Sequence, residues 1–180
     1  MHPIPPLDNF GRRIMICGPS NAGKSTLAAA LAHKLDVEPV YIDLLRHAPD
    51  TDWQLRPNDE FHRLHTEAVG GDGWVMEGNY SSLYEERLSR ATGIIMLGTD
   101  RFSALARYIR RTLLERQRIG GLAGNRDSLK FRLAHYILFV QPKKRDRDIA
   151  RLSTSGLPLL VLRSMADTNR LYAAWNLTRG

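Results

Sequence analysis

The sequence predicts an α/β fold in which a parallel sheet of five strands is covered by helices on both faces. Short apolar runs alternate with longer helical segments along the chain, and this pattern indicates strand–helix–strand units. A glycine-rich loop connects the first apolar run directly to the first helix. The length of 180 residues suits one domain with a single core. We therefore expect one domain over residues 12–180, preceded by an irregular leader at 1–11.

The first half of the chain contains three of the expected strands. Residues 14–17 are apolar and lead into glycine, which indicates a buried strand. Leu27, Leu31 and Leu35 recur at helical spacing, so a helix follows the glycine-rich loop. Asn58 is the expected N-cap of a further helix. In chain order we expect a strand at 14–17, a helix at 25–35, a strand at 37–42, a polar loop at 50–57, a helix at 59–69 and a strand at 74–76.

The second half of the chain becomes strongly basic after its first helix and strand. Apolar residues recur at helical spacing over 101–118, and Gly120 and Gly121 then interrupt this helix. We expect a lid at about 117–130, since glycines favour a mobile loop, and Pro142 stops the helix that follows. The expected elements are a helix at 81–90, a strand at 93–97, helices at 101–118 and 129–140, a strand at 157–162 and a helix at 168–177.

The positive charge is concentrated in one part of the chain. The net charge is +7, but residues 101–151 contain fourteen Lys/Arg and four acidic residues, a net charge of +10. Of the 26 basic residues, 21 are Arg, whose planar guanidinium binds phosphate at two points. This region is therefore a phosphate clamp, a nucleic-acid surface or a solvated arginine-rich face. The sequence leaves all three interpretations open.

Composition argues against several classes of protein. No apolar run approaches the ~18–20 residues that span a bilayer. The N-terminal segment, with its prolines and Asp8, is unlike a signal peptide. Cys17 is the single cysteine, so it forms no internal disulfide, and we expect it to be buried. The six histidines lack the spacing of metal ligands, so we expect no zinc. We expect a cytoplasmic protein without a membrane partner, whose oligomeric state the sequence does not indicate.

Residues 18–25 match the pattern G-x-x-x-x-G-K-[ST] of the phosphate-binding loop called Walker A. Gly18 and Gly23 allow the backbone to turn tightly, so that its N–H groups surround a polyphosphate. We expect Lys24 to reach the β- and γ-phosphates and the Ser25 hydroxyl to bind Mg²⁺. The residues expected to bind the nucleotide are Gly18, Pro19, Ser20, Asn21, Ala22, Gly23, Lys24, Ser25 and Thr26.

Carboxylates follow two of the expected strands. Asp43 comes after the second strand and Glu77 after the third, and the carboxyl ends of strands are where α/β sheets bind ligands. We expect Asp43 to orient an acceptor hydroxyl or to hold Mg²⁺ through water, and Glu77 to bind Mg²⁺ or the acceptor. Arg46, three residues after Asp43, is expected to bind a phosphate or carboxylate of the acceptor. The alternative is that these carboxylates only cap strand ends.

Arginines in the basic region are candidates for stabilising a transferred phosphoryl group. Arg107 and Arg111 are four residues apart and share one helix face, and Arg116 lies just before the glycine break. A closing lid would bring such arginines to the γ-phosphate; the alternative is that each lies on the surface. Arg163 follows the last strand and is expected to contact the base or the phosphates. The run at 143–147 is interpreted as the start of a solvated helix.

These segments together resemble the small adenylate-kinase-like ATPases known as DNA topology modulation proteins, in the nucleoside monophosphate kinase-like superfamily. The shared features are the phosphate-binding loop, Asp43, Arg56-Pro57 and Glu77-Gly78-Asn79-Tyr80, in that order. The resemblance implies use of ATP and Mg²⁺, a sheet of order 2-3-1-4-5 and a short Arg-rich lid. It also implies an acceptor site at Asp43, Arg46, Arg56 and Asn79. Asn79-Tyr80 stands where monophosphate kinases usually have Pro-Arg, so one arginine expected near the acceptor is missing.

These features predict a P-loop kinase that transfers the γ-phosphoryl group of ATP to a small acceptor such as a nucleotide or metabolite. Two alternatives are a nucleic-acid-associated ATPase and a toxin-like kinase that acts on a macromolecule. Few aromatic residues interleave with the basic ones, so nucleic-acid binding by stacking is not favoured. The chain lacks a guanine-reading Asn/Thr-Lys-x-Asp segment, which favours ATP over GTP.

Overall fold

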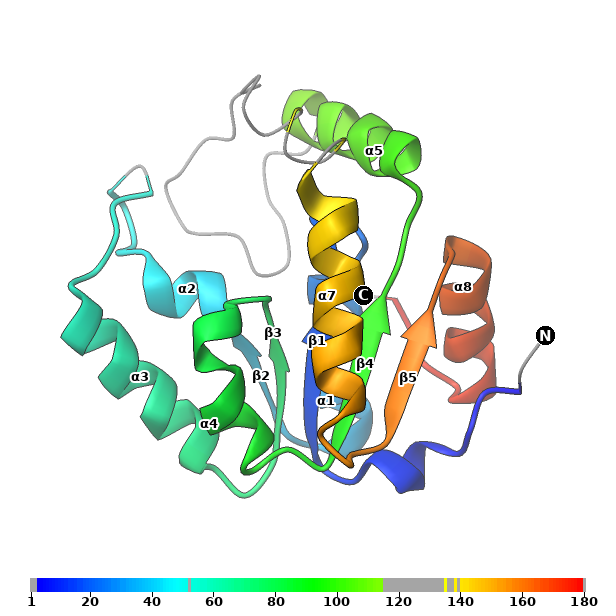
Figure 1. The fold of residues 1–180 in the computed structure, drawn as a ribbon, viewed down its shortest axis with the longest axis horizontal. Helices are drawn as coiled ribbons and strands as arrows, with labels where there is room; N and C mark the ends of the chain where they lie inside the picture. Colours follow the sequence, from blue (N-terminus) through cyan, green and yellow to red (C-terminus); the bar gives the residue numbers. More distant parts are fainter. Residues whose placement is uncertain (1–2, 52, 115–134, 136–137, 139, 180) are drawn as a thin grey trace.

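A computed structural model of the chain describes residues 3–51, 53–114, 135, 138 and 140–179. Their centre is one sheet with helices on both faces (Figure 1). The sheet has five strands in the order β2-β3-β1-β4-β5, and each neighbouring pair is parallel. This confirms the expected fold class. The strands are β1 (Arg13–Cys17), β2 (Glu38–Tyr41), β3 (Trp74–Glu77), β4 (Gly93–Leu97) and β5 (Leu159–Leu162).

The helices lie in two layers and at one edge of the sheet. In Figure 1, α5 lies beyond the carboxyl ends of the strands, while α7 crosses one face of the sheet. One face packs α1 (Lys24–Leu35) and α8 (Met165–Ala174), and the other packs α3 (Asn58–Gly70), α4 (Tyr84–Leu88) and α7 (Gln141–Ser153). The remaining elements are α2 (Ile42–Arg46), α5 (Arg101–Leu114) and the 3₁₀ helices η1 (Leu7–Phe10) and η2 (Ser81–Leu83).

The central strand β1 serves both faces of the core. Ile14 and Ile16 pack against the α1 and α8 face, whereas Met15 and Cys17 pack against the α3, α4 and α7 face. All four side chains are fully buried. A strand covered on both sides has no solvent face, which explains why its sequence is continuously apolar rather than alternating. Burial also raises the pKa of the Cys17 thiol, which therefore stays protonated.

Two of the element boundaries that differ from the prediction lie at the carboxyl ends of strands. β2 ends at Tyr41 and α2 begins at Ile42, so Asp43 lies in the first turn of a short helix. The helix α8 begins at Met165, earlier than expected, because Ser164 closes a capping box with Asp167. The Ser164 hydroxyl accepts a hydrogen bond from the Asp167 backbone N–H at 3.2 Å, and the Asp167 carboxylate accepts one from the Ser164 N–H at 3.0 Å.

Other segments differ in the kind of helix or in its extent. Residues 7–10, expected to be irregular, form η1, and the ring of Phe10 packs against Trp175 with centroids 5.4 Å apart. The single helix expected at 81–90 is a 3₁₀ turn followed by the five residues of α4. The run at 143–147 lies in α7, whose first turn contains Pro142. The lid expected at 117–130, and most of the helix expected at 129–140, fall outside the described residues. Within the described part of the chain, no helix has the length and apolar character needed to cross a membrane.

Candidate active site

The loop between β1 and α1 has the backbone geometry of an anion cradle. We call residues 18–25 the phosphate loop. Gly18 has φ +142°, and a Cβ there would lie 2.5 Å from the carbonyl oxygen of Leu97 on β4. Gly23 has φ +88° and is the N-cap of α1, with open space around it. Glycine is thus required at Gly18 by both conformation and space, and at Gly23 by conformation. The loop leads directly into a helix N-terminus, where backbone N–H groups attract phosphate.

Alanine substitutions at Gly18 and Gly23 separate the cost of an unfavourable backbone φ from the cost of a steric clash. Both variants adopt an unfavourable positive φ, which costs about 1–3 kcal/mol, but only Gly18→Ala places a methyl group against Leu97. We expect Gly23→Ala to lower the melting temperature by roughly 2–10 °C and Gly18→Ala to lower it more. Thermal melting by circular dichroism measures this difference. Equal shifts would mean that the contact with β4 does not constrain the loop.

The phosphate loop and the end of β3 meet at Ser25 and Glu77. The Ser25 hydroxyl donates a hydrogen bond to Glu77 Oε1 at 2.9 Å, and Glu77 is only 5% exposed. The Lys24 ammonium donates to the carbonyl of Pro19 at 3.1 Å, so it lies back over its own loop. The structure therefore brings three of the residues expected at the catalytic centre, Lys24, Ser25 and Glu77, to one place.

The Ser25 and Glu77 pair fits a magnesium ion. A hydroxyl and a carboxylate are hard oxygen ligands, and Mg²⁺ at nucleotide sites is held by one or two protein oxygens together with phosphate oxygens and water. Among the residues that the structure describes, no group of three or more His, Cys, Asp and Glu side chains forms a self-sufficient metal site. An ion here would therefore depend on the nucleotide for most of its ligands, as in other phosphoryl-transfer sites.

Asn79 fastens the phosphate loop to the loop after β3. Its side-chain oxygen accepts from the Gly18 N–H at 2.9 Å, and its side-chain N–H₂ donates to the Gly18 carbonyl at 2.9 Å. Both polar groups of the Asn79 side-chain amide are thus bonded to the backbone of Gly18. Asn79 was expected at the acceptor site, but here it supports the first glycine of the phosphate loop.

Asp43 and Gly18 lie at the same edge of the sheet. Glu77 is in register with Tyr41 of β2 and with Ile16 of β1, so Asp43 and Gly18 each lie two residues beyond that level. Asp43 is exposed, and this edge, the carboxyl end of the strands, is where ligands bind in α/β sheets. The carboxylate of Asp43 is therefore open to a ligand at the same sheet edge as the phosphate loop.

Tyr80 holds the Asp43 side chain. Its hydroxyl donates a hydrogen bond to Asp43 Oδ1 at 2.7 Å. Burial of the phenol, together with the nearby Asp43 charge, raises the pKa of Tyr80 far above its ordinary value. The phenol therefore stays protonated and acts as a donor at every ordinary pH, which leaves the second oxygen of Asp43 for another partner.

Arg46 lies in the same cluster and is held on several sides. Its Nη1 donates to the Arg56 carbonyl at 3.1 Å and to Asn58 Oδ1 at 2.9 Å, and its guanidinium lies 5.0 Å from the centre of the Phe61 ring. Asn58 is thus not the N-cap of α3, as expected. Pro57 occupies that position without a side-chain cap, because the Asn58 side chain binds Arg46 instead. Arg56, expected at the acceptor site, forms an ion pair with Glu60 at 2.8 Å.

The structure describes where three of the four remaining candidate arginines lie in the fold. Arg107 and Arg111 lie on α5, whose first turn is capped by Asp100, and Arg116 falls outside the described residues. Arg163 is exposed just after β5, and its backbone N–H donates to the Asp167 carboxylate at 2.8 Å. Their contact with a nucleotide stays a prediction.

Sequence reasoning missed the roles of two residues. Tyr80 was noted only as part of a motif, and Arg87 was not singled out. Arg87 is fully buried and donates to the carbonyls of Gly78, Asn79 and Tyr80. One signal was available: Arg87 follows Leu83 and Tyr84 at the i+4 and i+3 positions, which places it on the buried face of its helix.

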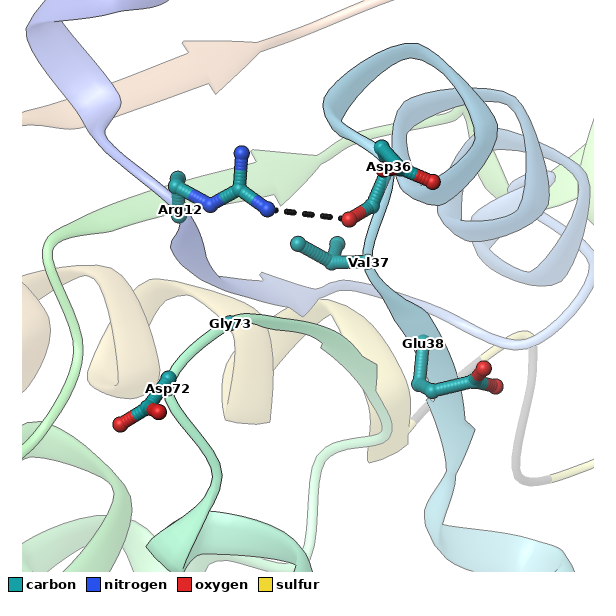
Figure 2. A pocket seen from close by; sticks show the side chains of 6 residues that line it. All are labelled: Arg12, Asp36, Val37, Glu38, Asp72 and Gly73. Carbon is teal, nitrogen blue, oxygen red and sulfur yellow. Dashed lines mark hydrogen bonds between the residues drawn. The ribbon is translucent and has the colours of Figure 1, made fainter.

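A hollow of about 300 Å³ lies at the opposite edge of the sheet, near the amino ends of β1, β2 and β3. Figure 2 shows the Arg12 guanidinium beside it, donating to the Asp36 backbone carbonyl at 2.9 Å. Parallel α/β sheets bind ligands at the carboxyl ends of their strands, so we do not place the active site there. The hollow is lined by Arg12, Asp36, Val37, Glu38, Asp72 and Gly73.

Comparison with known proteins places this geometry in a known fold. No protein-family model and no curated protein matches the sequence. A presumed kinase from Chloroflexus aurantiacus is similar in structure, with a TM-score of 0.54, 14% identity, and coverage of 92% of this chain and 97% of its own. Shikimate kinase from Bacteroides thetaiotaomicron gives a TM-score of 0.53 at 17% identity, over 92% of this chain and 99% of its own. The chain therefore has the fold of small P-loop kinases.

Proposed function

We propose that this protein is an ATP-dependent kinase that transfers the γ-phosphoryl group to a small acceptor bearing a hydroxyl or phosphate oxygen. The observation that carries the proposal is the 2.9 Å contact between Ser25 of the phosphate loop and the buried Glu77. This contact puts a magnesium-type ligand pair beside the triphosphate cradle. The exposed Asp43 at the same sheet edge supplies the second half of a phosphotransfer site.

The residues divide into three tasks. The phosphate-loop N–H groups and Lys24 bind the β- and γ-phosphates. Ser25 and Glu77 would hold Mg²⁺, which when bound neutralises charge on the phosphates. The acceptor oxygen attacks the γ-phosphorus, the bond to the β–γ bridging oxygen breaks, and ADP leaves. Where the acceptor is a hydroxyl, Asp43 takes its proton, while Tyr80 keeps the carboxylate oriented.

The acceptor side favours a small anionic molecule. Arg46 is fixed against Phe61 and Asn58 near Asp43, and a guanidinium fixed in this way suits a phosphate or carboxylate group. The same segment carries Arg56 nearby, whose backbone N–H donates to the Arg46 carbonyl at 2.9 Å. We place the acceptor between α2 and the loop after β3, on the basis of these contacts.

A transfer screen tests this proposal. Radiolabelled [γ-³²P]ATP and Mg²⁺ are incubated with the protein and separate panels of nucleoside monophosphates, nucleosides, sugar acids and small hydroxy acids. We expect label to move to a member of one panel. Label that appears only as free phosphate, and faster with DNA present and low salt, would favour a nucleic-acid-associated ATPase. Label on RNA or protein alone would favour a kinase that acts on macromolecules.

Asp43→Asn and Tyr80→Phe separate proton acceptance from orientation. Asn keeps the hydrogen bond from Tyr80 but cannot accept a proton, so we expect kcat to fall by about 10²–10⁴-fold with a hydroxyl acceptor. Phe keeps the ring but frees Asp43, so a smaller loss of about tenfold is expected. Steady-state kinetics with the acceptor identified by the screen measures both. An Asp43→Asn enzyme with unchanged kcat would remove Asp43 from the reaction.

A further inference from the structure

The loop after β3 is arranged around one buried cation. The Arg87 guanidinium donates from Nη1 to the Gly78 carbonyl at 2.8 Å, and from Nη2 to the carbonyls of Asn79 and Tyr80 at 3.1 and 2.9 Å. Its Nε points toward the Leu83 carbonyl at 3.4 Å. Four carbonyl oxygens, three of them on consecutive residues, thus converge on a single side chain.

The surroundings of Arg87 make this arrangement costly. Arg87 is 0% exposed, and no carboxylate of the described residues forms an ion pair with it. Its guanidinium lies 4.9 Å from the centre of the Tyr84 ring, and burial lowers its pKa from the ordinary value. A buried cation without a paired anion is unfavourable. The carbonyl oxygens and the Tyr84 ring therefore offset the cost of removing the Arg87 charge from water. An apolar residue at this position would therefore stabilise the fold about as well as Arg87 does.

The three carbonyls belong to residues that serve both halves of the site. Asn79 binds Gly18 of the phosphate loop through two hydrogen bonds, and Tyr80 binds Asp43 through one. Gly78 has φ +138°, and a Cβ there would lie 3.0 Å from Ile42, the first residue of α2. The 78–80 loop therefore contacts the phosphate loop on one side and the first residues of α2 on the other.

We propose that Arg87 is a positioning residue that fixes the 78–80 loop, and through it sets Gly18 for the nucleotide and Asp43 for the acceptor. This inference rests on the proposed function for its acceptor half, whereas its nucleotide half requires only that the phosphate loop binds nucleotide. Lysine cannot replace Arg87 in this role, because an ammonium is a point donor that cannot span three carbonyls in a fixed fork.

The test is nucleotide binding, which does not require turnover. A fluorescent ATP analogue with Mg²⁺ is titrated into the wild-type protein and into Arg87→Lys, Asn79→Ala and the double variant. We expect each single variant to bind about tenfold more weakly, and the double variant to bind no more weakly than the weaker single one, because both changes release the same loop. Circular dichroism confirms that each variant is folded at the assay temperature. Arg90→Lys is the matched control, since Arg90 is exposed and, within the described residues, its side chain donates a hydrogen bond to the Gly70 carbonyl and not to the 78–80 loop.

The outcomes distinguish this inference from the proposed function. A folded Arg87→Lys variant with wild-type affinity would overturn the positioning role, as would losses that add in the double variant. If Arg87→Lys does not fold, hydrogen exchange at the Gly18 amide is compared between the wild type and Arg87→Met, an apolar substitution that leaves Asn79 in place. Faster exchange in a folded Arg87→Met supports the positioning role, and unchanged exchange overturns it. A wild-type protein that binds the analogue but phosphorylates no acceptor would refute the kinase, while leaving the effect of Arg87 on nucleotide binding intact.

Discussion

Lys24→Ala is expected to reduce phosphoryl transfer by about 10³-fold or more while leaving the fold intact. In the proposed function, Lys24 is the cation that binds the β- and γ-phosphates, where the negative charge moves during phosphoryl transfer. In the described part of the chain, its ammonium donates a hydrogen bond to the Pro19 carbonyl at 3.1 Å. Alanine is also favourable in the first turn of a helix. The measurement is initial rate with the acceptor from the screen, or ADP release if no acceptor is found.

The control for this variant lies on the same helix. Lys34→Ala removes the same charge from an exposed position in the last turn of α1, far along the helix from the phosphate loop. Its rate should stay within a factor of two of wild type, and both variants should melt within a few degrees of it. Undiminished transfer by a folded Lys24→Ala protein would mean that this loop does not carry the chemistry.

Glu77→Gln is expected to lower the rate by about 10²-fold and to raise the Mg²⁺ concentration that gives half-maximal activity. Gln has nearly the same shape, and its carbonyl can still accept the hydrogen bond from Ser25. The variant therefore removes a negative charge from a buried position, where Glu77 is 5% exposed, and changes little else. Loss of that charge weakens the binding of a hard divalent cation more than it weakens a hydrogen bond from a neutral group.

A titration with Mg²⁺ separates the two explanations for this variant. If Glu77 binds the ion, high Mg²⁺ should restore part of the activity of Glu77→Gln. If Glu77 only holds Ser25, Glu77→Gln should keep a rate and a Mg²⁺ dependence close to those of the wild type, because the Gln carbonyl still accepts the hydrogen bond from Ser25. That outcome would refute the metal role. Glu38→Gln serves as the control, since Glu38 is an exposed carboxylate at the opposite end of β2.

The parts of the fold that could be predicted are those set by local sequence. β1 and β4 are apolar runs, and two of the three residues with positive φ in the phosphate loop, Gly18 and Gly23, are glycines, the third being Asn21 at φ +62°. α2 could not be predicted, because its five residues are too few to show a helical period. Its start is fixed instead by Ile42, which packs beneath Gly78 from another part of the chain. The capping box at Ser164 was visible as a sequence pattern and was overlooked.

The site likewise has a part that local sequence predicts and a part that it does not. Lys24 and Ser25 belong to a motif and Glu77 ends a strand, so the sequence could predict that they lie close together. The partners of Asn79 could not, because its bonds with Gly18 join residues 61 positions apart. Arg87 was harder still: its spacing from Leu83 and Tyr84 points to the buried face of its helix, but a charged residue in a helix of five residues is usually exposed. Of the α7 segment, sequence showed only charges, whereas the structure buries Asp148 to 8% exposed against Tyr84.

The hydrogen bonds between α2 and α3 have a practical consequence for engineering. Arg46 and Arg56 bond to each other twice, and the Ala48 N–H donates to the Gln54 carbonyl at 2.9 Å, so this segment closes on itself. It joins the edge strand β2, whereas the phosphate loop leaves the central strand. The proposed function then implies that residues 42–58 can be exchanged as a unit. A chimera that carries the corresponding segment of a kinase with this fold should change which acceptor is used while ATP affinity stays the same. Ile42, which is buried against Gly78, and Asp43, which accepts a hydrogen bond from Tyr80, would need to be kept at the junction.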